Sequence, residues 1–242
     1  MVEFRAIPSL ILQKNNFVKG NQFKNHRYVG DPRNIIKIFN DKDVDEIVIV
    51  NPFVKNLSKE NLYFLSKVLS HCFLPITYGG GIKNISDIEN LNRIGVEKYL
   101  FKYTNDFDIS FLKEVSSIKG QQSIVLHIPF IKIQDKILLK KKFFFNKYLD
   151  MDKLKKISKF AGEIVFTDVT REGLRKGIDS SEFISDKIDS ILCPVLYQGG
   201  VRNSSDLKTL KELNFSGALV GASYIFAGSI NSVNIGYFRE EL

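Results

Sequence analysis

The chain has 242 residues, of which 44% are apolar and 26% charged, and its formal net charge is +8 at pH 7. This length allows one large domain or two small ones, and the charge suits an anionic partner without by itself indicating nucleic-acid binding. No apolar run approaches the roughly 20 residues of a membrane-spanning helix, and the first residues lack the basic region and cleavage site of a signal peptide. We therefore expect a cytoplasmic protein with no membrane partner.

Short apolar runs alternate with helix-like segments along the whole chain. The predicted strands are β-branched or otherwise apolar, and they cover residues 5–12, 46–50, 74–78, 98–101, 122–128, 163–167, 193–197 and 217–221. Predicted helices include residues 31–44, 58–72, 84–95 and 204–215. Ser58 is an expected N-cap and Gly95 an expected helix stop.

This alternation predicts a parallel sheet covered by helices. At about 250 residues such a sheet closes most naturally into a (β/α)8 TIM barrel, which we expect to form a single domain over residues 1–242. A doubly wound open sheet is the alternative.

Two segments of the chain repeat one another. When Pro75 is set on Pro194, "LPITYGGGIKNISDIENL" (residues 74–91) and "CPVLYQGGVRNSSDLKTL" (residues 193–210) share a Pro, a Tyr, two Gly, an Asn, a Ser, an Asp and a Leu. "DEIVIV" (residues 45–50) and "GEIVFT" (residues 162–167) recur at nearly the same offset. The repeat predicts two-fold pseudo-symmetric half-barrels, whereas an open sheet does not require matching halves.

The glycine runs of this repeat follow predicted strands and precede predicted helices. Loops at the carboxyl ends of barrel strands carry function, and their N–H groups, with a helix N-terminus, suit a phosphate. Gly173 and "GASYIF" (residues 221–226) belong to similar loops. A tight turn explains any single run equally well. Two symmetric runs favour phosphate binding, at two sites that suit a small molecule phosphorylated at each end.

The cysteines, the histidines and one basic aromatic segment indicate no additional functional site. Cys72 and Cys193 are the only cysteines, no CxxC pair exists, and the three histidines are scattered, so we expect no disulfide framework, metal site or cofactor. The basic and aromatic segment "KKKFFFNKY" (residues 140–148) has the composition of single-stranded nucleic-acid sites. Without an accompanying nucleic-acid motif, we favour a solvated hairpin there and expect no nucleic-acid partner.

In order along the chain stand "RAIPSLIL", "FVKG", "YVGDP", "DEIVIV", "YGGGI", "AGEIVFTDVTREG", "QGGV" and "GAS". These motifs resemble the cyclase subunit family of imidazole glycerol phosphate synthase, a (β/α)8 barrel of the histidine pathway, over essentially the whole chain. The resemblance implies that ammonia comes from a glutaminase subunit docked at the amino-terminal face of the barrel. It then passes through the barrel to a bisphosphorylated substrate at the other end.

The resemblance also assigns site residues. The family's phosphate-binding positions are matched by Lys19, Gly81, Thr167, Gly173, Gly200, Ala222 and Ser223. Lys102 and Tyr103 replace an Asn–Thr pair on the first-half phosphate side, and Asn51 replaces a further aspartate. The two aspartates that the family uses as acid and base are replaced by Ile11 and Pro129, neither of which can transfer a proton.

Four charged residues each stand directly before a predicted strand: Arg5, Glu46, Lys98 and Glu163. Two cations and two anions at that end of the barrel can pair into a closed ring, as buried charges require. By resemblance, this ring is the gate through which ammonia passes. The alternative is that each is an ordinary solvated residue at a helix–strand junction.

The stretches "LILQ", "FKNHRYVGDP" and "IKIFNDKDVDEIV" resemble most closely a branch of this family associated with acetamidino modification of surface-polysaccharide sugars. That branch acts alongside a glutaminase and a sugar amidotransferase, so we expect a barrel that passes ammonia on for amidination. Two alternatives stay open. One is a genuine cyclase in histidine biosynthesis, for which Asp168, with Glu172 nearby, is the only newly placed carboxylate. The other is a non-catalytic barrel that binds a phosphorylated ligand.

Overall fold

Eight parallel strands form the centre of the computed structural model, which describes residues 3–134, 136–141, 144–179, 188, 190–228 and 230–239. The barrel strands, in chain order, are β1 (Arg5–Gln13), β4 (Ile47–Val50), β5 (Ile76–Gly79), β6 (Lys98–Lys102), β7 (Ile124–Ile133), β10 (Glu163–Asp168), β11 (Val195–Gln198) and β12 (Gly217–Val220). Each strand pairs with the next, and β12 pairs with β1, so the sheet closes on itself. The predicted (β/α)8 barrel is confirmed, and the open-sheet alternative is wrong.

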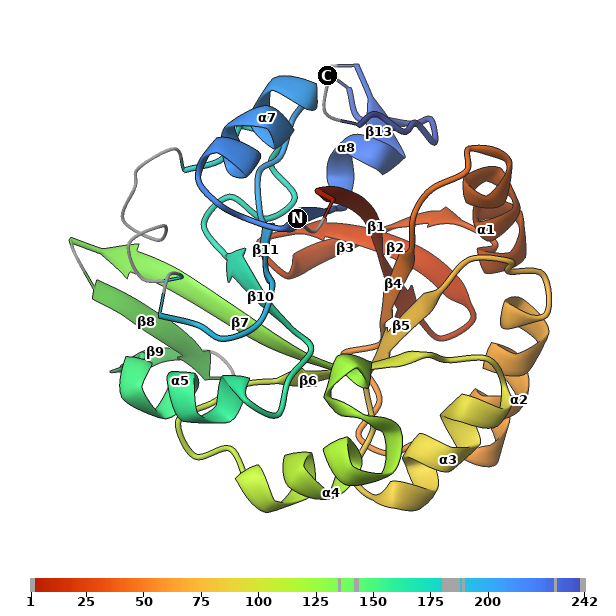
Figure 1. Cartoon of the computed structure of the whole chain (residues 1–242). Coiled ribbons are helices and arrows are strands. Elements are labelled where there is room, and N and C mark those ends of the chain that lie inside the picture. Colours follow the sequence, from red (N-terminus) through yellow and green to blue (C-terminus); the bar gives the residue numbers. More distant parts are fainter. Residues whose placement is uncertain are drawn as a thin grey trace.

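The helices lie around the outside of the strands (Figure 1). In the described part of the chain they are α1 (Pro32–Asp41), α2 (Lys59–Leu69), α3 (Ile85–Arg93), α4 (Ile109–Lys119), α5 (Met151–Ser158), α7 (Ser204–Glu212), the short α8 (Ala222–Ile225) and the 3₁₀ turn η1 (Gln121–Ser123). Ser58 caps α2 as predicted, because its side chain accepts from the backbone N–H of Asn61 at 3.2 Å. Gly95, with φ +96°, follows Ile94, the C-cap of α3, as the predicted helix stop. None of the described helices is long and apolar enough to cross a membrane.

The interior of the barrel contains a layer of apolar side chains. Successive residues of a strand face opposite sides, so every second residue of each strand points to the barrel axis. The inward apolar layer consists of Ile7, Val48, Leu100, Val125, Val165, Leu196 and Leu219. Residues on the other side of the strands, such as Ile49 and Tyr78, pack with helix residues such as Leu65 and Leu91 in the main core. The axis is thus a packed column of side chains.

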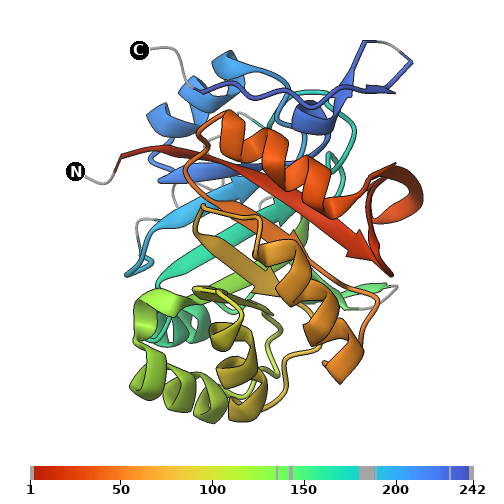
Figure 2. The same ribbon diagram turned by 90° about the vertical axis from the view of Figure 1, so that its right-hand side faces the viewer.

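Two β-hairpins extend the barrel beyond its carboxyl-terminal end, and the sequence patterns did not predict the first of them. β2 (Asn16–Asn21) and β3 (Lys24–Gly30) follow β1, and β8 (Lys136–Lys141) and β9 (Phe144–Tyr148) follow β7. Figure 2 shows β1 running from the amino-terminal end of the barrel, at the left, toward these extensions at the right. The basic aromatic segment, residues 140–148, contributes to the second hairpin, with residues 142–143 outside the described part.

The two halves of the barrel repeat one another in backbone conformation. Gly80 and Gly199 have φ +133° and +125°, and Gly81 and Gly200 have φ +73° and +82°. After each pair, an N-capping asparagine, Asn84 before α3 and Asn203 before α7, starts the next helix. All these pairs are separated by the 119 residues at which the sequence repeats. The predicted pseudo-symmetry is therefore present in the structure.

Glycine is required at the first position of each pair. A Cβ atom on Gly80 would lie 2.2 Å from the carbonyl oxygen of Asn51, and one on Gly199 would lie 2.6 Å from that of Asp168. Gly80→Ala and Gly199→Ala should each lower the free energy of unfolding by at least about 2 kcal/mol. Urea denaturation of the purified variants measures this.

The matched control is Gly236→Ala, because a Cβ atom there meets nothing within 4 Å. We expect it to change the free energy of unfolding by less than about 0.5 kcal/mol. Equal stability of all three variants would show that the two turns tolerate ordinary side chains.

Candidate functional site

Four charged side chains form a closed ring at the amino-terminal end of the barrel axis. Arg5 contacts Glu46 at 3.0 Å and Glu163 at 2.7 Å, and Lys98 contacts the same two carboxylates at 2.7 and 3.1 Å. Each cation therefore touches both anions, and the ring joins strands from both halves of the barrel. The structure thus brings together the four residues that the sequence placed before strands. We call them the charged ring.

The charged ring is largely removed from solvent. The side chains of Glu46 and Glu163 are 5% and 10% exposed, and those of Arg5 and Lys98 are 20% and 19% exposed. Thr77 Oγ1 also donates to Glu46 at 2.5 Å. Burial lowers the pKa of Arg5, but the charges of the two carboxylates outweigh this effect and raise the pKa overall. The guanidinium of Arg5 therefore keeps its charge within the ring.

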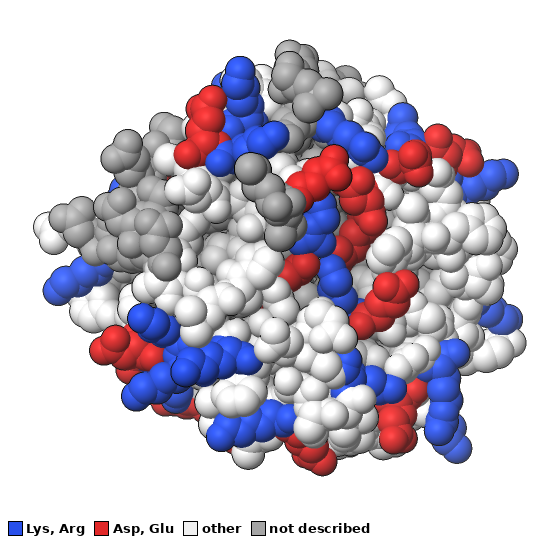
Figure 3. Space-filling view, viewed as in Figure 1, with Lys and Arg blue, Asp and Glu red and all other residues white. Residues whose placement is uncertain are grey.

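Figure 3 views the end of the barrel at which the strands begin. Charged side chains of both signs gather near the middle of this face, and mostly uncharged surface surrounds them. Two large apolar side chains, Phe73 and Leu192, are exposed in the loops just before β5 and β11. They occupy equivalent positions in the two half-barrels, 119 residues apart.

Polar side chains from four strands form a second group on the axis, beyond the apolar layer. His127 Nε2 and Thr167 Oγ1 are 2.8 Å apart, Thr167 Oγ1 donates to Gln198 Oε1 at 2.9 Å, and Gln198 Nε2 donates to Ser9 Oγ at 3.3 Å. We call these four residues the polar belt. Sequence reasoning singled out only Thr167. His127 follows the inward-facing Val125 by two residues, so strand alternation was the signal that could have placed it inside.

His127 is neutral at pH 7. Its enclosure among the strands lowers its pKa from 6.5 to about 4, and the positive charge of Lys102 acts in the same direction. Thr167 is fully buried, whereas Lys102 is exposed at the mouth of the barrel. The four belt residues are therefore uncharged, and the cation Lys102 stands beside His127, in register with it on β6.

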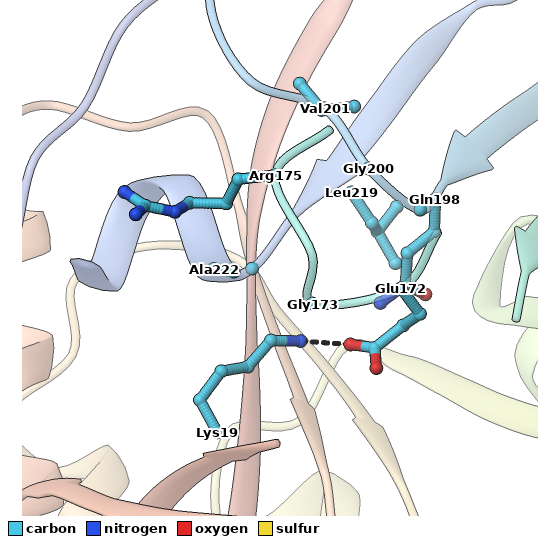
Figure 4. A pocket seen from close by; sticks show the side chains of 11 residues that line it. Lys19, Glu172, Gly173, Arg175, Gln198, Gly200, Val201, Leu219 and Ala222 are labelled. Atoms are coloured by element: carbon cyan, nitrogen blue, oxygen red, sulfur yellow. Dashed lines mark hydrogen bonds and ion pairs between the residues drawn. The ribbon is translucent and has the colours of Figure 1, made fainter. Parts of the chain in front are cut away.

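A pocket opens at the mouth beside the loops of the second half-barrel (Figure 4). It is lined by Lys19, Glu172, Gly173, Arg175, Gln198, Gly199, Gly200, Val201, Leu219, Gly221 and Ala222. Four of the predicted phosphate-binding residues, Lys19, Gly173, Gly200 and Ala222, meet here. Thr167 touches the pocket's Gln198, and the hydroxyl of Ser223 donates to the carbonyl of Val201.

Lys19 is paired inside this pocket with a residue that sequence reasoning did not assign to it. Its ammonium group forms an ion pair with Glu172, and both side chains are only 2% exposed. Arg175, on the rim, donates to the backbone carbonyls of Phe226 and Gly228. The pocket thus combines a buried cation, its counter-ion and glycine backbone.

The first half-barrel is different. Gly81 and Lys102 are not among the residues that line this pocket. Tyr103 is buried, and its hydroxyl has no hydrogen-bond partner within the described part of the chain. The loop of Gly81 instead packs closely against Val54 and Asn56. The two predicted phosphate sites are therefore unequal in the structure.

Asp168 is held by its own loop. Its carboxylate accepts from the N–H and hydroxyl of Thr170 at 2.8 and 2.6 Å and lies 3.5 Å from Arg171. Because its neighbour Thr167 faces the axis, Asp168 faces the other side of the strand. This carboxylate stabilises a turn and does not project into the mouth.

Ile11 and Pro129 occupy inward-facing positions, Ile11 near the end of β1 and Pro129 in the middle of β7. Both are buried. Proline is tolerated in β7 because the neighbouring strand β6 has already ended at this level. The last register pair between β6 and β7 is Lys102 with His127, and the N–H of Tyr103 donates to the carbonyl of His127. No carboxylate stands at either position.

The chain is a (β/α)8-barrel protein. It has a charged ring at one end of its axis and a pocket among glycine loops at the other, which is the end where barrels of this class carry their sites. Residues 5–231 match the model of the histidine biosynthesis protein family, and the chain belongs to this family. An imidazole glycerol phosphate synthase subunit, provisionally so named, of Pseudomonas aeruginosa is 31% identical over 98% of this chain and 96% of its own length.

Two further relatives carry the same provisional name. The protein of Leptospira borgpetersenii is 31% identical over 98% of this chain and 96% of its own, and that of Campylobacter jejuni is 28% identical over 93% and 90%. The chain is therefore a barrel of the imidazole glycerol phosphate synthase cyclase-subunit type.

Breaking the charged ring should be costly, because removing one cation leaves two buried carboxylates with a single cation between them. We expect Lys98→Met to lower the free energy of unfolding by about 3 kcal/mol in urea denaturation. The control is Lys147→Met. Lys147 is 3.0 Å from Asp106 in an exposed pair, so its loss should cost less than about 1 kcal/mol. Similar losses in both variants would contradict a desolvated ring.

Proposed function

We propose that this barrel receives ammonia from a glutaminase subunit at its amino-terminal face and conducts it along the axis to its mouth. The observation that carries this proposal is the charged ring across the axis. Buried ion pairs are expensive to desolvate and contribute little net stability, so a closed ring of four is poorly explained as a structural device. The ring also lies at the opposite end of the axis from the pocket, where it cannot contact a ligand bound there.

The surface around the ring suits a protein partner. Phe73 is 88% exposed and Leu192 is 58% exposed, and both flank the ring at the same end of the barrel. Aromatic residues are enriched in protein–protein interfaces, and exposed apolar side chains beside polar groups mark interaction sites. A glutaminase seated there would deliver ammonia directly onto the ring, shielded from bulk water.

The mouth supports transfer of ammonia more readily than cyclisation. Ile11 and Pro129 supply no acid or base at the positions where the resemblance implies them, and Asp168 is engaged in its own turn. We infer that the ammonia is passed on for amidination in surface-polysaccharide sugar biosynthesis, in the cytoplasm, with a sugar amidotransferase as a further partner. In this proposal, the pocket around Lys19 binds a phosphorylated small molecule at the mouth of the barrel, the end at which the ammonia arrives.

Co-purification tests the proposal. A tagged chain should retain a glutaminase from the same organism, and the complex should release glutamate from glutamine faster than the glutaminase alone. Phe73→Asp and Leu192→Asp should each raise the Kd of this complex at least about tenfold, because they place a charge in an apolar contact.

Tyr28→Asp is the matched control, since Tyr28 is 64% exposed on β3, in the hairpin at the opposite end of the barrel. It should leave the Kd unchanged. The proposal fails if no glutaminase binds. It also fails if the chain does not change the rate of glutamate release and neither interface variant changes the Kd.

A second prediction concerns the pocket. Lys19→Met should weaken binding of inorganic phosphate at least about tenfold, because the buried Glu172 carboxylate would then repel the anion. Glu172→Gln should have the opposite effect, because it frees the charge of Lys19. Isothermal titration calorimetry measures both, with the exposed Lys208→Met as control. Equal affinities in all variants would place phosphate elsewhere.

A further inference from the structure

The polar belt lies on the barrel axis between the apolar layer and the mouth. Its members come from β1, β7, β10 and β11, and each follows an apolar-layer residue of its own strand by two positions. Anything that crosses the charged ring and the apolar layer must therefore meet Ser9, His127, Thr167 and Gln198 next. The belt residues form hydrogen bonds with one another and with neither the charged ring nor the Lys19–Glu172 pair, so their role is separate from both.

The hydrogen bonds of the belt run in one direction. Gln198 Nε2 donates to Ser9 Oγ, which leaves Gln198 Oε1 to accept the single hydroxyl proton of Thr167. Thr167 has then no proton left for His127, so the imidazole Nε2–H must donate to Thr167 Oγ1. The belt thereby fixes the Nε2–H tautomer, and Nδ1 keeps a free lone pair.

The two ends of this chain of hydrogen bonds have opposite character. His127 Nδ1 is an acceptor, and Ser9, whose oxygen already accepts from Gln198, keeps its own O–H as a donor. Ammonia carries three N–H donors and one lone pair. The four belt residues present one acceptor and one donor without a formal charge, and the neighbouring Lys102 repels cations, so the layer matches neutral ammonia better than it matches ammonium.

We propose that the polar belt is an ammonia-binding site on the barrel axis, in which His127 Nδ1 accepts an N–H group of ammonia. The source of the ammonia rests on the function proposed above, but the binding site itself does not. A neutral imidazole does not hold ammonium as strongly as a carboxylate would. Because burial lowers its pKa to about 4, its protonated form is too strong an acid to coexist with ammonia, and the ring stays neutral beside it. Ammonia bound here therefore keeps the lone pair that makes it a nucleophile.

Nuclear magnetic resonance of the chain labelled with ¹⁵N-histidine tests the site directly. The chain has three histidines, and His127→Gln assigns the resonances of interest. At neutral pH, His127 should show a protonated Nε2 and an unprotonated Nδ1. Addition of ammonium chloride at alkaline pH, where free ammonia is abundant, should shift the Nδ1 resonance saturably. Potassium chloride at the same concentration should not, and the exposed His71 should respond to neither salt.

Thr167→Val keeps the shape of the side chain and removes the hydroxyl that orients the ring. The ammonia-dependent shift should be lost in this variant, although the imidazole is still present. The proposal is overturned if Nδ1 of the unmodified chain carries a proton at neutral pH, or if ammonia leaves its resonance unmoved. An equal response to potassium would also overturn it, since the site would then be one for cations.

A second measurement separates this site from the glutaminase proposal. In the complex with a glutaminase, addition of glutamine without ammonium salt should produce the same shift at His127. If no complex forms but ammonium chloride shifts Nδ1, the binding site stands and the glutaminase proposal fails. If the complex forms and neither treatment shifts Nδ1, the proposed binding site fails and the glutaminase proposal stands.

Discussion

Closure of the barrel is the constraint on which every functional feature of this chain depends. Once eight strands pair around a circle, strand alternation sends every second residue of each strand to one shared axis. The axis then carries three successive layers: the charged ring, the apolar layer and the polar belt. Charges can be held in the first layer only because Arg5 and Lys98 each reach both Glu46 and Glu163. An open sheet would expose the same residues singly and leave them solvated.

The two-fold repeat gives the mouth two sets of glycine loops with the same backbone conformation but different surroundings. Their backbones still coincide in φ at Gly80 and Gly199 and at Gly81 and Gly200. The pocket lies beside the second set. Lys19 reaches this pocket from the first hairpin and pairs there with Glu172, so it contains a buried cation. The shared backbone conformation reflects the steric need for glycine, whereas the side chains that surround the two loop sets differ.

The layers of the axis separate the mouth of the barrel from its amino-terminal end. Ile11 and Pro129 change the mouth, yet the charged ring lies at the far end, beyond the apolar layer, and contacts neither of them. His127 adds a polar group just below the level of Pro129. The proposed conduction of ammonia and the chemistry at the mouth are therefore separable, because different layers of one axis carry them.

Most of the fold followed from the sequence alone. Apolar runs predicted the strands, the 119-residue offset predicted the matching halves, and charges placed before four strands predicted a ring, because each of these is a local or periodic pattern. The hydrogen bonds among His127, Thr167, Gln198 and Ser9 could not be predicted in this way, nor could the pairing of Lys19 with Glu172. These contacts join residues up to 189 positions apart, and they depend on the register between strands and on rotamers chosen by packing. The sequence by itself determined which residues face the axis, and only the tertiary structure decided which of them touch.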